Sequence, residues 1–305
     1  MEVAPGITMI DTLLDGVAGV TAAYLVSGAS PALVDSGAQT SAPAVLAALE
    51  AIGLAADDLA WLVLTHVHLD HCGAVGDLAA AFPGATVVVH PRGARHLVAP
   101  DRLVAASAAV YGDLASVYGG LTAVDQDRIM AAPHGARIAL GGTRELVMLD
   151  APGHARHHMA VLDEATGAVM AGDALGVQFA GAGLYPAVPP PEFDLDAALD
   201  TLAALDDLAP ETLLLGHFGP VPDPSEAIAE ASDRQVRIAH AARDAWRAGG
   251  AADVGPAVQR ALPLEPTVGD DAALERWRWL RWCENNVTGL QAWLERANRA
   301  DDAER

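Results

Sequence analysis

The sequence predicts an α+β domain with four layers, αββα, followed by a helical extension. Two runs of short apolar segments, each followed by segments with helical spacing, indicate two sheets packed face to face with helices outside them. Beyond segment 220–224 the strand-like segments stop and helical spacing continues. The chain has 305 residues, enough for one large domain with an appendage. We therefore expect a main domain at residues 1–222 and a helical extension at 223–305.

The elements of the first half follow from apolar, often β-branched runs separated by glycine, serine and proline. The expected strands are Ile7–Ile10, Val20–Val26, Ala32–Asp35, Trp61–Leu64 and Thr86–Val89. Apolar residues at helical spacing predict a helix at Ala42–Ile52, where Gly53 is a natural stop, and another at Ala74–Phe82. Residues 91–135 are mostly helical or irregular, and Leu103–Tyr118 is the main helix expected there.

The second half repeats the order of strands and then helices. The expected strands are Glu145–Leu149, His158–Leu162, Ala168–Ala171 and Thr212–Leu215, with an amphipathic helix at Asp194–Leu205 before the last of them. The extension is expected to contain helices at Ser225–Ala248, Ala251–Leu262 and Asp271–Ala297.

Tryptophan is concentrated in the extension, which holds five of the six. In the last helix Trp279, Trp282, Asn286 and Trp293 form a stripe beside an apolar one. This surface either faces the core, or caps a substrate pocket or forms the seam of a homodimer.

Composition narrows the classes of function. Hydrophobic residues make up 52% and charged residues 19%, which excludes a disordered chain. Acidic residues outnumber basic ones by 40 to 18, and the resulting charge of −22 disfavours nucleic-acid binding. Only two cysteines, Cys72 and Cys283, are present, and the first residues lack the pattern of a signal peptide. Uncharged stretches are broken by glycine or proline, so we expect a cytoplasmic protein without a membrane partner.

Four side chains able to bind a metal occur within six residues, 66–71, shortly after a predicted buried strand. They are His66, His68, Asp70 and His71. In an extended chain the first three point to one side, and His71 then needs a turn, for which Gly73 supplies a flexible point. With 11 histidines in the chain, this pattern arises by chance on the order of once per thousand chains. The segment therefore predicts a metal site.

Three further candidates follow glycines at predicted strand ends, where the backbone can turn tightly beside an ion. They are His154, Asp173 and His217. Together with the His66–His71 segment they provide five imidazoles and two carboxylates, a set that suits two borderline divalent cations such as zinc. By contrast, we expect structural roles for His90, His96, His134 and His240.

In the order of these motifs the sequence resembles the metallo-β-lactamase-fold superfamily over roughly residues 7–220, beginning with Asp35 in Leu33–Gly37. The resemblance implies the four-layer fold of that superfamily and, from the presence of both His154 and Asp173, its glyoxalase II and lactonase branch. It implies that His66, His68 and His154 hold one ion, that Asp70, His71 and His217 hold the other, and that Asp173 bridges the two. It also implies that Asp35 supports the site without being a ligand.

Such a centre predicts a metal-dependent hydrolase. Two divalent ions, most suitably zinc, with iron or manganese as alternatives, favour a bridging hydroxide that attacks the carbonyl of an ester, thioester or lactone in a small molecule. Asp70 and Asp173 are the expected catalytic residues, and Asp70 is a candidate for passing a proton to the leaving group. The alternative is a mononuclear iron persulfide dioxygenase of the same fold, which the identity of the metal would distinguish. A nuclease is disfavoured by the acidic charge.

Residues near the predicted ligands are candidates for binding substrate. Phe179 and Tyr185 belong to an apolar loop, Leu175–Phe193, that follows Asp173 and suits a moderately hydrophobic substrate. His158 is a third candidate, and its neighbour His157 shares the ambiguity between a role at the site and a structural one. Cys72 is interpreted as a packed small residue outside the site.

Overall fold

The computed structural model describes residues 1–179, 183–262 and 282–304. The chain forms two compact units. The first contains residues 1–151, 157–172 and 210–224, and the second contains residues 152–156, 173–209 and 225–305. We describe each unit by itself.

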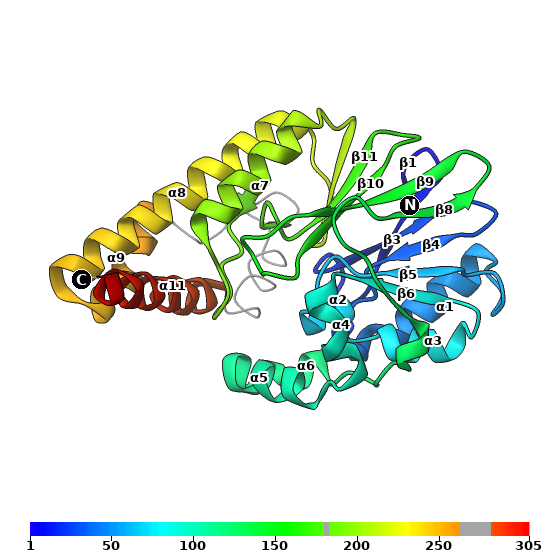
Figure 1. The fold of residues 1–305 in the computed structure, drawn as a ribbon, viewed down its shortest axis with the longest axis horizontal. Coiled ribbons are helices and arrows are strands. Elements are labelled where there is room, and N and C mark those ends of the chain that lie inside the picture. Colours follow the sequence, from blue (N-terminus) through cyan, green and yellow to red (C-terminus); the bar gives the residue numbers. More distant parts are fainter. Residues whose placement is uncertain (180–182, 263–281, 305) are drawn as a thin grey trace. The chain divides into compact units, whose positions relative to one another are not determined.

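Two sheets form the centre of the first unit (Figure 1). One has seven strands in sequence order, and its last four strands are parallel. They are β1 (Glu2–Ala4), β2 (Ile7–Asp11), β3 (Ala22–Val26), β4 (Ala32–Val34), β5 (Trp61–Val63), β6 (Thr86–Val89) and β7 (Ile129–Ala131). The other sheet has the order β15-β14-β11-β10-β9-β8. Its strands are β8 (Arg137–Gly141), β9 (Arg144–Asp150), β10 (Met159–Asp163), β11 (Ala168–Gly172), β14 (Thr212–Leu215) and β15 (Gly219–Pro220).

The two sheets share one apolar core. Alternate residues point to opposite faces of a strand, so each strand sends every second side chain to the same side. Tyr24 and Val26 of β3 lie in one buried cluster with Met148 of β9 and Val161 of β10. The predicted pair of sheets packed face to face is therefore confirmed, and burial of these side chains drives their association.

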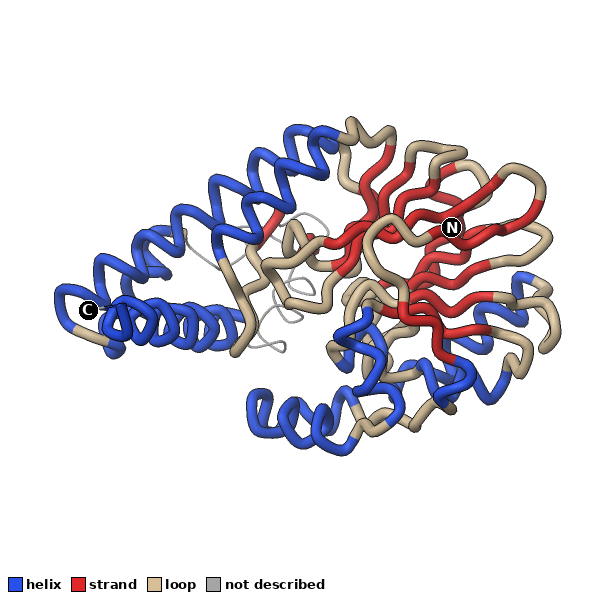
Figure 2. Tube along the Cα trace, viewed as in Figure 1, coloured by secondary structure: helices blue, strands red, loops and turns tan. Residues whose placement is uncertain are grey.

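Helices of the first unit lie on one side of the seven-stranded sheet (Figure 2). α1 (Ala42–Ile52) packs on β2, α3 (Val75–Ala81) on β6 and α4 (Pro91–Val98) on β7. The short α2 (Leu69–Cys72) precedes α3, and α5 (Asp101–Tyr111) and α6 (Ala115–Tyr118) follow α4. The 3-10 turns η1 (Gln39–Ser41), η2 (Gly112–Leu114) and η3 (Gln126–Arg128) complete this unit.

Several element boundaries agree with the sequence and others correct it. α1 has the predicted bounds, and Gly53 ends it in the left-handed conformation with φ 95°. The single helix expected at Leu103–Tyr118 is wrong: Gly112, with φ 56°, divides it into α5 and α6. The sequence analysis also missed β1, β7 and β8, because these strands carry polar residues, prolines or charges nearby.

The second unit is mainly helical. It contains α7 (Leu195–Asp207), whose N-cap Asp194 accepts a hydrogen bond from the backbone N–H of Ala197 at 3.1 Å. The small β12 (Val177–Phe179) and β13 (Gly183–Tyr185) pair antiparallel. The remaining elements are α8 (Pro224–Gly249), η4 (Ala251–Asp253), α9 (Val254–Ala261) and α11 (Trp282–Glu304). Among the described helices, none combines the length and apolar character needed to span a membrane.

The α+β class and the C-terminal helices are thus as predicted. Of the predicted last helix, residues 271–281 lie outside the described residues, and with them Trp279. The side chain of Trp282 is likewise not described. In the described part, the Trp293 ring packs edge-on against Phe193, with the ring centroids 6.1 Å apart, and lies 4.9 Å from the Arg243 guanidinium. The domain boundary at residues 222 and 223 and the homodimer stay predictions.

Candidate metal centre

The His66–His71 segment leaves β5 and then turns into a helix. The extended chain expected as far as Asp70 is wrong, because α2 begins at Leu69. The turn needed to reach His71 therefore comes before Gly73, which has ordinary helical φ and ψ. Gly73 is required for a different reason: a Cβ there would lie 2.4 Å from the Leu69 carbonyl oxygen and 2.5 Å from the Gln39 nitrogen.

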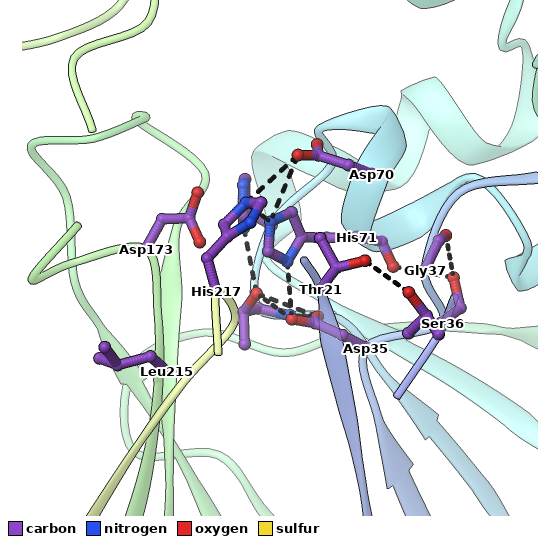
Figure 3. A network of polar contacts seen from close by, with 12 residues as sticks. Thr21, Asp35, Ser36, Gly37, Asp70, His71, Asp173, Leu215 and His217 are labelled. Carbon is purple, nitrogen blue, oxygen red and sulfur yellow. Dashed lines mark hydrogen bonds and ion pairs between the residues drawn. The ribbon is translucent and has the colours of Figure 1, made fainter. Parts of the chain in front are cut away.

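Three of the predicted ligands converge in the first unit (Figure 3). His71 Nε2 lies 3.3 Å from His217 Nε2, and the Asp70 Oδ2 atom lies 3.3 Å from His217 Nε2 and 3.8 Å from His71 Nε2. α2 supplies Asp70 and His71, and the turn after β14 supplies His217. The imidazoles are almost fully buried, whereas the Asp70 side chain is 18% exposed.

The partners of the other ring nitrogens determine the tautomers. His71 Nδ1 donates to Asp35 Oδ2 at 3.0 Å, and His217 Nδ1 donates to the Val20 carbonyl at 2.9 Å. A carboxylate and a carbonyl only accept, so the proton of each neutral ring lies on Nδ1 and the lone pair on Nε2. Two lone pairs and a carboxylate oxygen therefore point toward one another, an arrangement that a cation between them stabilises.

The spacing of these atoms suits a small divalent metal ion. Ligands bound at about 2.0–2.1 Å with tetrahedral angles lie about 3.3–3.4 Å from one another. Two of the three separations in the cluster are 3.3 Å. The donor set and its geometry thus fit a divalent ion held by Asp70, His71 and His217.

Asp35 holds two histidines in place. It follows β4 with φ 61°, an uncommon conformation for a residue other than glycine. Its carboxylate accepts from the Thr65 backbone N–H at 2.8 Å, from the Thr65 hydroxyl at 2.8 Å and from His71. Because the Thr65 hydroxyl gives its proton to Asp35, its oxygen accepts from His66 Nδ1 at 3.0 Å. Asp35 thus orients His71 directly and His66 through Thr65.

Sequence reasoning gave Thr65 no role, although it immediately precedes the histidine segment. The carbonyl of Val20 was also missed. The Thr65 hydroxyl could have been recognised in the sequence as a hydrogen-bond partner of His66, because the two residues are adjacent. The contact of the Val20 carbonyl with His217 could not, because folding brings together residues far apart in the chain.

Four other imidazoles of the first unit gather around His66, those of His68, His71, His157 and His158. The His66 ring centroid lies 4.6 Å from that of His68, 4.2 Å from that of His71 and 4.9 Å from that of His158. The His157 ring is stacked on that of His66 at 6.3 Å, and its Nδ1 accepts from the Val67 N–H at 3.4 Å. His157 and His158 precede β10 and are both buried.

The other two predicted ligands meet in the second unit. His154 Nε2 lies 3.5 Å from Asp173 Oδ2, and His154 Nδ1 donates to the Ala187 carbonyl at 3.0 Å. His154 therefore has the same tautomer as His71 and His217. Gly153 precedes it with φ 128°, and a Cβ there would lie 2.3 Å from the Ala198 Cα, so only glycine fits.

The candidate substrate residues differ in what surrounds them. The Tyr185 ring is buried beneath the Arg234 guanidinium, 5.2 Å from its centroid. Phe179 ends β12, and its side chain lies outside the described residues. The roles of both and of His158 toward a substrate stay predictions.

Cys72 is fully buried, and burial, followed by the negative charges of Asp70 and Asp35, raises the pKa of its thiol well above the usual value. A thiol kept protonated in this way agrees with a packed small residue.

Residues 16–217 match the sequence profile of the metallo-beta-lactamase superfamily, which is two thirds of the chain. The chain belongs to the metallo-beta-lactamase superfamily. Its fold is the metal-dependent, hydrolase-like fold of that superfamily, whose members bind divalent metals.

Individual relatives agree with this assignment. The metallo-beta-lactamase fold-containing protein ST1585 of Sulfurisphaera tokodaii is 34% identical over 167 residues, which are 53% of this chain and only 62% of that relative. The uncharacterized protein YobT of Bacillus subtilis is 28% identical over 208 residues, 65% of this chain and 83% of YobT. The crystal structure of ST1585 has a TM-score of 0.71 at 26% identity, covering 94% of this chain and 98% of its own. TTHA1429 of Thermus thermophilus, with a TM-score of 0.64 at 21% identity over 96% of this chain and 94% of its own, shows the shared fold alone.

Proposed function

We propose that this protein is a dinuclear metal-dependent hydrolase, most suitably with zinc, that cleaves an ester, thioester or lactone bond in a small molecule. The observation that carries the proposal is the convergence of Asp70, His71 and His217 with both imidazole lone pairs directed inward. A cluster of this kind is a metal-binding geometry, and the superfamily supplies the prior for hydrolysis.

Chain connectivity supports adding Asp173 to this centre. Asp173 is bonded to Gly172, so their Cα atoms are about 3.8 Å apart. Gly172 ends β11, which runs parallel to β14, and its carbonyl accepts from the N–H of Gly216 at 2.9 Å. Gly216 is bonded to His217. Neighbouring parallel strands thus end together, each followed by one of the two proposed ligands.

His154 is constrained in the same way. It lies in the segment between Ala151 and His158, which are joined by a hydrogen bond of 3.0 Å from the Ala151 N–H to the His158 carbonyl. His158 in turn lies beside His66. We therefore assign His66, His68 and His154 to one ion, Asp70, His71 and His217 to the other, and Asp173 to both.

When bound, two such cations would lower the pKa of water to about 7 and polarise a carbonyl oxygen, which is the chemistry that hydrolysis requires. Asp35 accepts hydrogen bonds from His71 Nδ1 and from the Thr65 hydroxyl, which in turn contacts His66. These bonds would keep the Nε2 atoms of His71 and His66 directed toward the metal. Asp70 is the most exposed group of the Asp70–His71–His217 cluster, which supports the proposal that its carboxylate passes a proton to the leaving group.

The presence of both His154 and Asp173 is the ground for proposing the glyoxalase II and lactonase branch, and the apolar segment after Asp173 favours a small, moderately hydrophobic substrate. The segment after Asp173 is apolar and largely buried and includes the candidate Tyr185. The net charge of −22 opposes polyanionic partners.

The test is a panel of lactones, thioesters and aryl esters with the zinc-loaded chain. We expect turnover of at least one class, and a loss of about 100-fold or more in kcat for Asp70→Asn at retained fold. Arg137→Met, a surface variant, serves as the matched control and should retain activity. Absence of turnover in every class, together with one tightly held iron and oxygen uptake with a persulfide, would overturn the hydrolase in favour of the dioxygenase.

A further inference from the structure

Two buried amide side chains of the C-terminal helices hold backbone next to the predicted ligands of the second unit. Asn286 of α11 is 1% exposed and Gln235 of α8 is 3% exposed. We propose that Asn286 is a positioning residue for the metal ligand His154, acting through the peptide between Ala187 and Val188. The inference rests on the proposed function, because that function makes His154 a ligand.

The Asn286 amide makes two hydrogen bonds to one short stretch of backbone. Its Oδ1 accepts from the Val188 N–H at 2.7 Å, and its Nδ2 donates to the Pro186 carbonyl at 2.8 Å. The two atoms belong to one planar group with a fixed spacing, so together they fix the orientation of the backbone on both sides of Ala187.

This orientation is transmitted to His154 by a single peptide unit. The Val188 N–H and the Ala187 carbonyl belong to the same peptide, and in a trans peptide these groups point in opposite directions. One side of the peptide is held by Asn286, and the other accepts from His154 Nδ1 at 3.0 Å. The bond to His154 fixes its proton on Nδ1 and directs Nε2 toward Asp173, 3.5 Å away.

Other contacts within the second unit bring α11 against Val188 and α8 against Ala174. A Cβ at Gly289 would lie 1.9 Å from the Val188 carbonyl oxygen, so α11 lies directly on this backbone. Gln235 Nε2 donates at 3.3 Å to the carbonyl of Ala174, the residue after Asp173. The two helices therefore hold the backbone next to both His154 and Asp173.

The test measures zinc affinity of the full chain by competition with a chromophoric chelator. Asn286→Leu keeps a similar side-chain volume but removes both hydrogen bonds, and we expect one of two zinc ions to bind about 10–100-fold more weakly. Gln291→Leu is the matched control: it removes an amide from the same helix whose Nε2 donates at 2.8 Å to the Ala251 carbonyl, away from the segment. Its zinc affinity should equal that of the wild type.

A double-mutant cycle separates positioning from general stability. In a His154→Ala background, Asn286→Leu should cause no further loss of zinc affinity, because its path ends at His154. If the leucine variant does not fold, Gly289→Ala, which crowds the Val188 carbonyl, should weaken the same zinc ion.

Unchanged zinc affinity in a folded Asn286→Leu chain, or an equal loss in both backgrounds, would overturn the inference while leaving the proposed function intact. A wild-type chain that binds no zinc, iron or manganese would overturn the proposed function itself.

Discussion

Asp35 and its partner Thr65 hold two of the predicted metal ligands in place. The Asp35 carboxylate is 3% exposed, and burial of a charge is tolerated only where donors surround it. Thr65 provides two of these donors and also accepts from His66 Nδ1. Its hydroxyl therefore stabilises a buried charge and also orients His66, a proposed metal ligand.

Thr65→Val should lower zinc affinity by about 10–100-fold, because His66 loses the acceptor that fixes its tautomer. It should also lower the free energy of unfolding by about 1–3 kcal/mol, because Asp35 loses a buried donor. Thr65→Ser keeps the hydroxyl and should restore most of the zinc affinity. Chelator competition and urea unfolding measure the two effects, and equal zinc affinity in the valine and serine variants would refute this role.

The sequence indicates candidate ligands because four side chains able to bind a metal are concentrated in His66–His71. The residues that hold these candidate ligands in place were harder to predict. Asn286 was assigned to a stripe with tryptophans, and its partners are the backbone atoms of Pro186 and Val188, about 100 residues away. Such contacts involve no side-chain pattern, so spacing along the chain does not indicate them.

At the scale of elements, one arginine closes the end of α3. Arg128 donates to the carbonyls of Ala79, Phe82 and Ala85, which lie at the end of that helix and in the turn before β6. The last carbonyls of a helix have no hydrogen-bond donor within the helix, and the Arg128 guanidinium donates to carbonyls at and just after the end of α3. Its removal leaves several partly buried acceptors unsatisfied.

Arg128→Met should therefore lower the free energy of unfolding by about 1–3 kcal/mol, measured by the urea midpoint. Arg137→Met is the control, since Arg137 is 46% exposed and pairs with Glu145 and Glu164 at the surface. Exposed pairs contribute about 0–1 kcal/mol. A larger loss for Arg137 than for Arg128 would contradict this interpretation.

The stability of the first turn of α4 should depend on pH. His90 Nδ1 accepts from the Arg92 N–H at 3.1 Å, and its Nε2 lies 3.5 Å from Asp150 Oδ1. Burial, opposed by Asp150 and reinforced by Arg92, lowers the pKa of His90. The folded pKa of His90 thus lies below the unfolded value of about 6.5. The stability that neutral His90 contributes is therefore complete above the unfolded pKa and is lost as pH falls below it and through the folded pKa.

His90→Asn keeps a capping acceptor that does not titrate. Between about pH 7.5 and pH 5.5 the variant should lose less unfolding free energy than the wild type. Urea unfolding at both pH values, in the presence of a chelator, measures the difference. An identical pH dependence in the two chains would show that His90 does not contribute.

Periodicity located the long elements well, because α1 and the buried strands bury a continuous face. Periodicity failed where one or two residues determine the direction of the backbone. α2 replaces an expected extended stretch at Leu69, and Gly112 interrupts an expected helix. In both places local backbone geometry, which apolar spacing does not encode, determines the outcome.

At the scale of the whole molecule, the acidic charge and the clustered ligands link folding to metal. Negative groups such as Asp70 repel one another less when a cation is bound, and an ion that binds only the folded chain stabilises it. At a free zinc concentration of about 100 times Kd, this contributes about 2.7 kcal/mol.

Removal of metal by EDTA should therefore lower the thermal unfolding midpoint of the wild type. The same treatment should have a smaller effect on His217→Ala, which lacks one proposed ligand. Differential scanning fluorimetry of both chains, with and without EDTA, measures the shift. Equal shifts would mean that EDTA acts elsewhere than at the cluster.

The proposed metal centre rests on the cluster of Asp70, His71 and His217 in the first unit. The most direct test is the identity and number of metal ions per chain, determined by elemental mass spectrometry on protein purified without added metal. The account predicts two divalent ions, chiefly zinc, and fewer in His71→Ala. A single iron per chain, or full metal content in His71→Ala, would contradict it.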